Sequence, residues 1–285
     1  MEQVKEQLKK MNMISDSITE ICYKDGICLY RLRCGKDSYV LKYFESIPDR
    51  REINNYKILE SLNVSTLKLI SHTNCCILME DIAESHVYRI GINEDLNDIQ
   101  VAAEVAKWYK ELHQKGKCFV RNYNGTLYDE NDFITLENIH FIKTKTATAH
   151  NPVWDIMEKN FETMRNCVDR AERTLTYNDF YYTNLIVAKD KSSAYMFDYN
   201  LLGKGYVYSD IRNVCSSLGA EAKKVFLSSY GEFNKDEVIL DDVSSLLTTL
   251  FFACKRDRFP KWAESYLHDL NDNFMVKLQM LFNLY

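Results

Sequence analysis

The stretch that decides the fold runs from Leu175 to Asn200 and reads L-T-Y-N-D-F-Y-Y-T-N-L-I-V-A-K-D-K-S-S-A-Y-M-F-D-Y-N. Its apolar and polar segments predict a strand, a polar and aromatic loop, a second strand, a turn and a third strand. Asp179, Asn184 and Asp198 lie at the ends of these strands. Because a hairpin brings the end of one strand beside the start of its partner, we expect the three side chains to come together.

These three residues have the chemistry that phosphoryl transfer from a nucleotide needs. One carboxylate can accept the proton of an attacking hydroxyl, while an amide oxygen and a second carboxylate can hold Mg²⁺ against the phosphates. Mg²⁺ prefers oxygen ligands and keeps several waters, so few protein ligands suffice. Asp179 precedes Asn184 by five positions, as in the kinase catalytic loop, which a metal-binding Asp also follows. Asp and Asn favour ordinary turns as well, so the pair alone is a weak signal that needs support from distant residues.

The composition is that of a globular protein with room for two packed lobes. The chain has 285 residues, of which 46% are hydrophobic and 27% charged, and its formal net charge is −5. This acidic balance argues against nucleic-acid and membrane partners, and no apolar run is long enough to span a bilayer. Nine cysteines without a C-x-x-C motif and a start that lacks an apolar signal core predict reduced thiols in a cytoplasmic protein.

Residues 1–82 predict a small sheet with one helix, which we interpret as a nucleotide-binding lobe. Asp25-Gly26 is a strong signal for a two-residue hairpin turn. Val40 and Lys42 share one face of the next strand, so Lys42 could reach nucleotide phosphates, although an exposed edge lysine fits equally well. Glu52 could pair with Lys42 or simply favour a helix N-terminus. The expected elements are helices over 4–13 and 48–62, and strands over 18–23, 27–33, 38–44, 66–71 and 75–79.

Residues 83–285 predict a mostly helical lobe that carries the catalytic loop and the acceptor site, because apolar residues recur there at helical spacing. Gly116 and Gly231 are expected to end two of its helices, and Ser209 or Asp210 to cap a third. The expected elements are helices over 96–115, 152–173, 209–218, 220–230, 236–253 and 262–284, a loop over 201–208, and an insertion or mobile loop with short helical pieces over 118–149.

In this order the parts resemble the aminoglycoside phosphotransferase and choline kinase family of small-molecule kinases. Y-N-D-F-Y-Y-T-N over 177–184 is similar to the family's H-G-D-x-x-x-x-N catalytic loop, and M-F-D-Y over 196–199 to its I-D-W or I-D-F segment. The G-x-G-x-x-x-x-D-I pattern over 203–211 resembles the family's G-x-G-D-P-x-x-D-L, and W-Y-K-E-L-H over 108–113 its L-x-x-L-H helix. The resemblance covers essentially the whole chain. It implies an α+β, two-lobed protein-kinase-like fold, with a small N-terminal antiparallel sheet plus helix and a larger, mostly helical C-terminal lobe.

The resemblance also implies roles for the residues of the central stretch. Asp179 would be the catalytic base, and Asn184 and Asp198 would be the Mg²⁺ ligands. Asp210 would support the catalytic loop from the helix that follows, a role that is compatible with capping that helix.

In the N-terminal lobe the resemblance implies nucleotide-binding residues. Lys42 would contact the phosphates and Glu52 would hold it in place. The backbone at Glu80, Asp81 and Ile82 would meet the adenine.

Three departures from the family pattern stand out. Tyr177 takes the place of the usual His, Asn178 replaces a Gly, and the nucleotide loop Y-K-D-G-I-C over 23–28 contains a single Gly. They motivate an alternative function, a nucleotide-binding pseudokinase or scaffold without transfer activity. A protein kinase is disfavoured, because the sequence contains no H-R-D or A-P-E segment.

The implied activity is transfer of the γ-phosphate of ATP or GTP, with Mg²⁺, to a hydroxyl of a small acceptor by a monomer or homodimer. A cationic acceptor, aminoglycoside-like or choline-like, would suit the acidic C-terminal helices, and Trp262 with the tyrosines could cage a quaternary amine. Ordinary solvated helix faces and a packed core explain the same residues. The acids in question are Asp236, Glu237, Asp241, Asp242, Glu264, Asp269 and Asp272.

Overall fold

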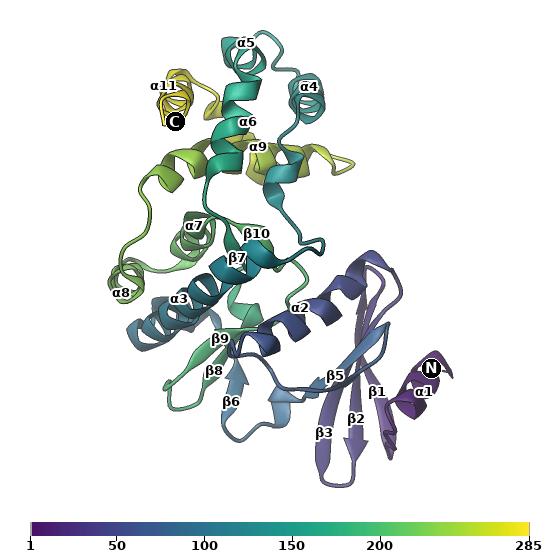
Figure 1. Ribbon diagram of the computed structural model, residues 1–285. Coiled ribbons are helices and arrows are strands. Elements are labelled where there is room, and N and C mark those ends of the chain that lie inside the picture. The colour runs from purple at the N-terminus through teal and green to yellow at the C-terminus, as the bar shows by residue number, and fades with distance from the viewer. Residues whose placement is uncertain (1, 285) are drawn as a thin grey trace. The chain divides into compact units, whose positions relative to one another are not determined.

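The computed structural model describes residues 2–284, and their contacts divide the chain into two compact units. The first unit comprises Met1–Lys115, Tyr177–Leu202 and Asn213–Gly231, and the second Gly116–Thr176, Gly203–Arg212 and Glu232–Tyr285. A small antiparallel sheet followed by a mostly helical remainder confirms the expected α+β, protein-kinase-like class (Figure 1). The functional division at residue 82 stays a prediction.

The first unit is built on an antiparallel sheet of five strands in the order β1-β2-β3-β5-β4 (Figure 1). Asp25 and Gly26 join β1 to β2 with φ of 50° and 80°, the positive values that a two-residue hairpin turn requires, so this turn prediction is confirmed. The strands are β1 (Ser17–Lys24), β2 (Ile27–Cys34), β3 (Asp37–Phe44), β4 (Leu69–His72) and β5 (Cys76–Glu80).

The two faces of this sheet have different neighbours because side chains alternate along each strand. On one face, Leu41 of β3 joins Val4 and Leu8 of helix α1 (Glu2–Lys10) in a buried apolar cluster. On the other face, Lys42 is paired in register with Leu29 and Ile77. Helix α2 (Arg51–Ser61) follows the 3-10 turn η1 (Pro48–Arg50) and lies on the Lys42 face.

The rest of the first unit contains a second sheet, of three strands in the order β6-β8-β9. Gly231, with φ of 91°, ends α8 as expected. The elements are η2 (Ile82–Glu84), β6 (Tyr88–Ile90), η3 (Asn93–Asn97), most of α3 (Ile99–Asn122), η5 (Tyr182–Asn184), β8 (Leu185–Ala188), β9 (Ala194–Met196), the later part of α7 (Val207–Ser217) and α8 (Ala220–Tyr230).

The prediction that Gly116 ends a helix is wrong, because α3 continues to Asn122. A Cβ atom at position 116 would lie 2.6 Å from the Leu175 backbone nitrogen and 2.6 Å from Thr174 Oγ1. Glycine at this position therefore permits close packing against strand β7 (Thr174–Thr176), rather than helix termination.

The second unit is mostly helical and buries Trp154, Met157, Leu250 and Leu278 in its core. Its helix α9 contacts α4 and α11, and β10 pairs with β7 in a two-stranded sheet. The elements are η4 (Glu130–Phe133), α4 (Leu136–Lys145), α5 (Pro152–Lys159), α6 (Phe161–Arg170), β10 (Gly203–Gly205), α9 (Asp236–Cys254), η6 (Lys261–Ala263), α10 (Glu264–His268) and α11 (Asp272–Phe282).

Three further predictions in this part of the chain are wrong in detail. The helix expected over 152–173 breaks at Asn160, whose φ of −111° and ψ of 20° depart from helical values, while its backbone N–H and its side chain both donate to Ile156 O. The helix expected over 262–284 breaks before Asn271, whose side chain caps α11. Helix α7 begins at Val207, so Ser209 and Asp210 lie within its first turn and not at its cap. None of the helices within residues 2–284 combines the length and apolar character that spanning a bilayer requires.

Candidate active site

Lys42 is the centre of a buried ion-pair network in the first unit. Its side chain is 7% exposed in the middle of the sheet, so the alternative of an edge lysine in solvent is wrong. Nζ lies 2.6 Å from Oε2 of Glu52, whose side chain is 1% exposed, and 2.9 Å from Oδ1 of Asp198. The structure thus brings together a residue from β3, one from α2 and one from the end of the β8–β9 hairpin.

Electrostatics keep Lys42 charged. Burial opposes its charge, but the carboxylates of Glu52 and Asp198 outweigh burial and raise the pKa of Lys42 above its ordinary value. Desolvation raises the pKa of the Glu52 carboxyl, and the neighbouring charge of Lys42 limits that rise. The network therefore presents a fixed ammonium group, which is the requirement for contacting phosphate oxygens.

The β8–β9 hairpin brings Asn184 beside Phe197, the residue that precedes Asp198, as its strand pattern predicts. Leu185 pairs with Met196 in the ladder, and Phe197 N donates to Asn184 O at 2.9 Å. The residues just before the first strand and just after the second are therefore neighbours.

Asp179 joins the same group through Asn184. Asn184 Nδ2 donates to Asp179 Oδ2 at 3.0 Å and to Asp179 O at 3.2 Å. Desolvation and the charge of Asp198 raise the pKa of Asp179, while the hydrogen bond from Asn184 and the charge of Lys42 oppose the rise. A half-buried carboxylate with a raised pKa is a suitable proton acceptor.

Tyr177 supplies hydrogen bonds in the position where the family that the sequence resembles has His. Its ring is fully buried, and its hydroxyl donates to Phe197 O at 2.5 Å and to Asp198 O at 3.2 Å. Asp198 itself has φ of 62°, in the left-handed region that non-glycine residues seldom adopt. Tyr177 therefore helps to hold the backbone of Asp198 in an unfavourable conformation that aims its carboxylate at Lys42.

Asn178 explains another departure from the family pattern. Its φ of 65° is again left-handed, a conformation that glycine adopts freely and that asparagine tolerates better than most residues. Its Nδ2 donates to Leu201 O at 3.0 Å, which glycine could not do. The replacement thus preserves the backbone turn and adds a contact to the segment after Asp198.

Asn55 is a buried polar residue beside this network that the sequence interpretation missed. It lies on α2, one turn after Glu52, and its Nδ2 donates to Tyr199 O at 2.7 Å and Leu202 O at 3.3 Å. These bonds tie the helix that carries Glu52 to the segment that carries Asp198. The spacing of three residues on one helix face was the signal that could have identified it.

The ion-pair network opens onto a cavity of about 570 Å³ that lies within the first unit and is of a size common for small-molecule sites. Lys42, Asp179 and Asp198 line it. Its other lining residues include Ile27, Leu29, Arg31, Val40, Glu52, Met79, Glu80, Asp81 and Ile82.

The side chain of Asp81 is already engaged at the edge of this cavity. It accepts hydrogen bonds from Arg31 Nε at 2.6 Å, Ser38 Oγ at 2.7 Å and Ala83 N at 3.2 Å. These bonds tie β2, β3 and η2 together. The Asp81 side chain is therefore not free to contact a ligand unless these bonds break.

The donor set fits Mg²⁺. The Asp198 side chain is 37% exposed and offers a carboxylate. Because Asn184 Nδ2 donates to Asp179, the amide oxygen of Asn184 is the atom of that side chain that could act as a ligand. Within residues 2–284 no group of three or more His, Cys, Asp or Glu side chains is arranged to hold a metal. Two hard oxygen donors suit Mg²⁺, which keeps several waters, and do not suit zinc.

Asp210 lies in the second unit and is fully buried in the first turn of α7. Its support of the catalytic loop stays a prediction. Three of the acids considered for a cationic acceptor already have partners in the same unit. Asp241 pairs with Arg212 at 2.6 Å, Glu237 accepts from Tyr208 N at 2.8 Å, and Asp242 lies 3.2 Å from Lys277.

No protein-family model matches the chain, and no curated protein matches it in sequence. Solved structures do match it. Choline kinase LicA from Streptococcus pneumoniae aligns with a TM-score of 0.61 at 13% identity, with 98% of each chain covered. The macrolide 2'-phosphotransferase MphH from Brachybacterium faecium aligns with a TM-score of 0.58 at 11% identity, covering 100% of this chain and 99% of the other.

A spectinomycin phosphotransferase in complex with ADP and spectinomycin aligns with a TM-score of 0.60 at 13% identity, covering 98% of this chain and 92% of the other. Together these structures confirm the small-molecule-kinase fold that the sequence resemblance implies. At such low identity the likeness establishes the fold alone, and the activity must be argued from the site.

Proposed function

We propose that the protein is a small-molecule kinase that transfers the γ-phosphate of ATP or GTP to a hydroxyl of a small acceptor. One observation carries the proposal: the buried Lys42 joins Glu52 and Asp198 on the wall of the cavity that Asp179 also lines. Kinase-type phosphoryl transfer needs a paired lysine and a metal-binding aspartate in place together.

Each residue has a defined task in this proposal. Lys42 would neutralise charge on the nucleotide phosphates, and Glu52 with Asn55 would keep it positioned. Asn184 and Asp198 would hold Mg²⁺, which supplies charge neutralisation of the phosphates when bound. Asp179 would orient the acceptor hydroxyl and take up its proton at a carboxylate oxygen. Most of the rate acceleration would come from positioning and charge stabilisation.

The nucleotide base would contact the backbone of Glu80, Asp81 and Ile82. These residues line the cavity, and the Asp81 side chain is held by three other groups. The solved structures with this fold include complexes with ADP or AMP, which supports a nucleotide co-substrate here.

We define the acceptor as a hydroxyl-bearing small molecule. Asp241, Glu237 and Asp242 are engaged by neighbours, so the acidity of α9 is not by itself evidence for a cationic acceptor. The guanidinium of Arg256 lies 5.9 Å from the centre of the Trp262 ring, so this ring already has a cationic neighbour. An aminoglycoside-like or choline-like acceptor is therefore a class to test directly.

The deciding experiment measures thermal stabilisation by ATP and GTP with and without Mg²⁺, followed by phosphate transfer to aminoglycosides, choline, ethanolamine and sugars. We expect Mg²⁺-dependent stabilisation by at least one nucleotide and transfer to at least one hydroxyl. Nucleotide binding without transfer or Mg²⁺-dependent hydrolysis would instead favour a pseudokinase or scaffold. The absence of stabilisation by either nucleotide would contradict both functions.

A further inference from the structure

A second cavity, of about 380 Å³, lies entirely within the second unit. Its walls carry four cationic side chains: Lys117 and Arg121 from the end of α3, Arg173 just before β7, and Lys204 on β10. The cavity has the size of a small-molecule site. Because the whole chain carries a net charge of −5, the gathering of these cations does not follow from composition.

Two of the cations share one carboxylate on the cavity wall. Lys117 Nζ lies 2.6 Å from Glu172 Oε2, and Arg121 Nη2 lies 3.5 Å from Glu172 Oε1. The side chains of Lys117 and Arg121 are 41% and 71% exposed, so both can reorient toward a ligand. The single carboxylate of Glu172 therefore pairs with two cations, Lys117 and Arg121.

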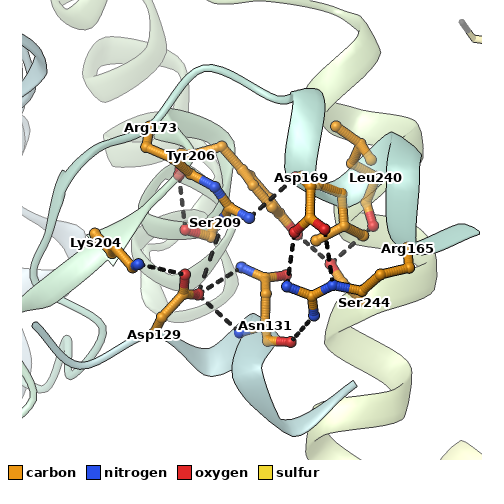
Figure 2. Close-up of polar contacts among 11 residues, drawn as sticks. Asp129, Asn131, Arg165, Asp169, Arg173, Lys204, Tyr206, Ser209, Leu240 and Ser244 are labelled. Carbon is orange, nitrogen blue, oxygen red and sulfur yellow. Dashed lines mark hydrogen bonds and ion pairs between the residues drawn. The ribbon is translucent and has the colours of Figure 1, made fainter. Parts of the chain in front are cut away.

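The other two cations share a second carboxylate, that of Asp129 (Figure 2). Arg173 Nη1 and Lys204 Nζ each lie 3.9 Å from it, beyond hydrogen-bond distance. Asp129 Oδ1 already accepts from the backbone N of Asn131 at 2.9 Å and from its Nδ2 at 3.0 Å. Arg173 Nη2 donates to Val168 O at 3.0 Å, whereas its Nη1 makes no hydrogen bond within residues 2–284.

The four cations and the two carboxylates that pair with them leave a surplus of two positive charges among these six groups. A bound dianion would neutralise the surplus. Guanidinium and ammonium groups are the side chains that recognise phosphate oxygens, by forked hydrogen bonds and by point charge respectively.

The aromatic wall of the cavity is fixed in place. The Tyr123 ring stacks on Phe119 with 4.7 Å between ring centres. A Cβ atom at Gly125 would lie 2.5 Å from that ring, so the ring packs directly on the bare backbone of Gly125. This part of the cavity wall is therefore held by packing within the second unit.

We propose that this cavity binds a small phosphate-bearing molecule as a dianion, either inorganic phosphate or an organic phosphate monoester. A phosphate monoester carries a charge of about −1.5 to −2 at neutral pH, which matches the surplus. The site uses no residue of the cavity proposed to bind nucleotide. The inference therefore does not depend on the proposed kinase activity.

Calorimetric titration of the full chain with inorganic phosphate and with glycerol phosphate, without nucleotide, tests the proposal. We expect Lys204→Gln and Arg121→Gln each to weaken binding about tenfold, since each removes a charged hydrogen-bond donor. Glu172→Gln should strengthen binding, because it removes a carboxylate that competes for Lys117 and Arg121. Lys159→Gln, which changes an exposed cation of α5, should leave binding unchanged.

The opposite signs of these changes make the test specific. Tighter binding of the monoester would identify an organic phosphate as the ligand, and equal binding would identify the phosphate group as sufficient. Equal weakening by Lys159→Gln, or no gain from Glu172→Gln, would overturn the proposal. The double variant Lys42→Met/Glu52→Gln changes only the first cavity, so we expect it to retain phosphate binding. If phosphate binding is lost in this variant and kept in Lys204→Gln, the anion binds in the first cavity. The substituted side chains at 121, 172 and 204 are partly exposed, so these variants are expected to fold.

Discussion

The cavities of the two units use the same ion-pair chemistry with opposite surplus charge. In the first, the lining carboxylates outnumber the cations Lys24, Arg31 and Lys42, and Lys42 itself faces Glu52, Asp179 and Asp198. In the second, four cations share two carboxylates. The first arrangement suits the proposed metal-nucleotide complex, and the second suits the proposed phosphate anion.

The cavities also differ in how firmly their charges are held. Lys42 and Glu52 are 7% and 1% exposed, whereas Lys117 and Lys204 are 41% and 39% exposed. The first cavity also depends on a left-handed backbone at Asp198, held by buried hydrogen bonds. Fixed, desolvated groups suit catalysis, and partly exposed groups suit reversible binding.

Asp179→Asn should produce the largest effect, because it removes the proton acceptor and leaves the rest of the first cavity in place. We expect turnover to fall by about 10²–10⁴-fold, with little change in the affinity for Mg²⁺-nucleotide. Steady-state kinetics and calorimetry on the same preparations measure both quantities. Equal turnover in the two proteins would remove Asp179 from the mechanism.

Lys42→Met should disrupt the buried ion pair of the first cavity. It leaves the Glu52 carboxyl buried without its cation, so the free energy of unfolding should fall by about 3–5 kcal/mol and nucleotide binding should be lost. Urea denaturation measures the first change. The double variant Lys42→Met/Glu52→Gln serves as the control and should recover part of the stability. A single variant as stable as the parent would show that the ion pair adds nothing.

Tyr177→Phe tests whether the backbone of Asp198 needs to be held. Loss of the hydroxyl leaves the Phe197 and Asp198 carbonyls without this donor and should cost about 1 kcal/mol of unfolding free energy, together with weaker Mg²⁺-nucleotide binding. Tyr43→Phe is the matched control, because its hydroxyl contacts Gln3 at an exposed position. If both variants behave alike, the hydroxyl of Tyr177 has no special role.

Asn178→Ala and Asn178→Gly form a pair that tests the left-handed turn. Alanine should cost roughly 1–2 kcal/mol, because its Cβ disfavours φ of 65° and its side chain cannot replace the bond to Leu201. Glycine loses the bond but accepts the backbone, so it should cost less. Thermal unfolding of the two variants gives the order, and a less stable glycine variant would contradict this explanation.

The smallest expected effect concerns salt. Raising NaCl should weaken phosphate binding at the second cavity several-fold, because Lys117, Arg121 and Lys204 are exposed enough to be screened. The buried pair of Lys42 and Glu52 should respond far less. Phosphate titrations at several salt concentrations, compared with urea denaturation at the same concentrations, measure the contrast. Identical salt dependence in both would erase the distinction between the two regions.

Much of the first cavity could be predicted because its residues lie in regular local patterns. The alternation Tyr39, Val40, Leu41, Lys42 placed Lys42 on the face away from α1, and the hairpin pattern placed Asn184 beside the residue before Asp198. The role of Tyr177 was not predictable, since its hydroxyl bonds to carbonyls about twenty residues later in the chain.

Predictions failed mainly where one residue left the helical backbone conformation or where a close approach mattered. Asn160 interrupts an apolar pattern that is otherwise continuous, because its φ of −111° and ψ of 20° end one helix and start the next. Gly116 is of the residue type that commonly ends a helix. Here it lies within a helix and permits close packing against Leu175, almost sixty residues away in the sequence. Neither outcome is encoded in spacing.

Periodicity and turn chemistry act over a few residues, so the class of fold, the order of the elements and the groups that could carry phosphoryl transfer were predictable from the amino-acid pattern. The burial of Lys42 between Glu52 and Asp198 is visible only in the folded protein. The same holds for the cavity with two carboxylates that is surrounded by Lys117, Arg121, Arg173 and Lys204. The burial and pairing of a charged side chain depend on which distant segments of the chain pack against it. Local sequence patterns do not specify that packing.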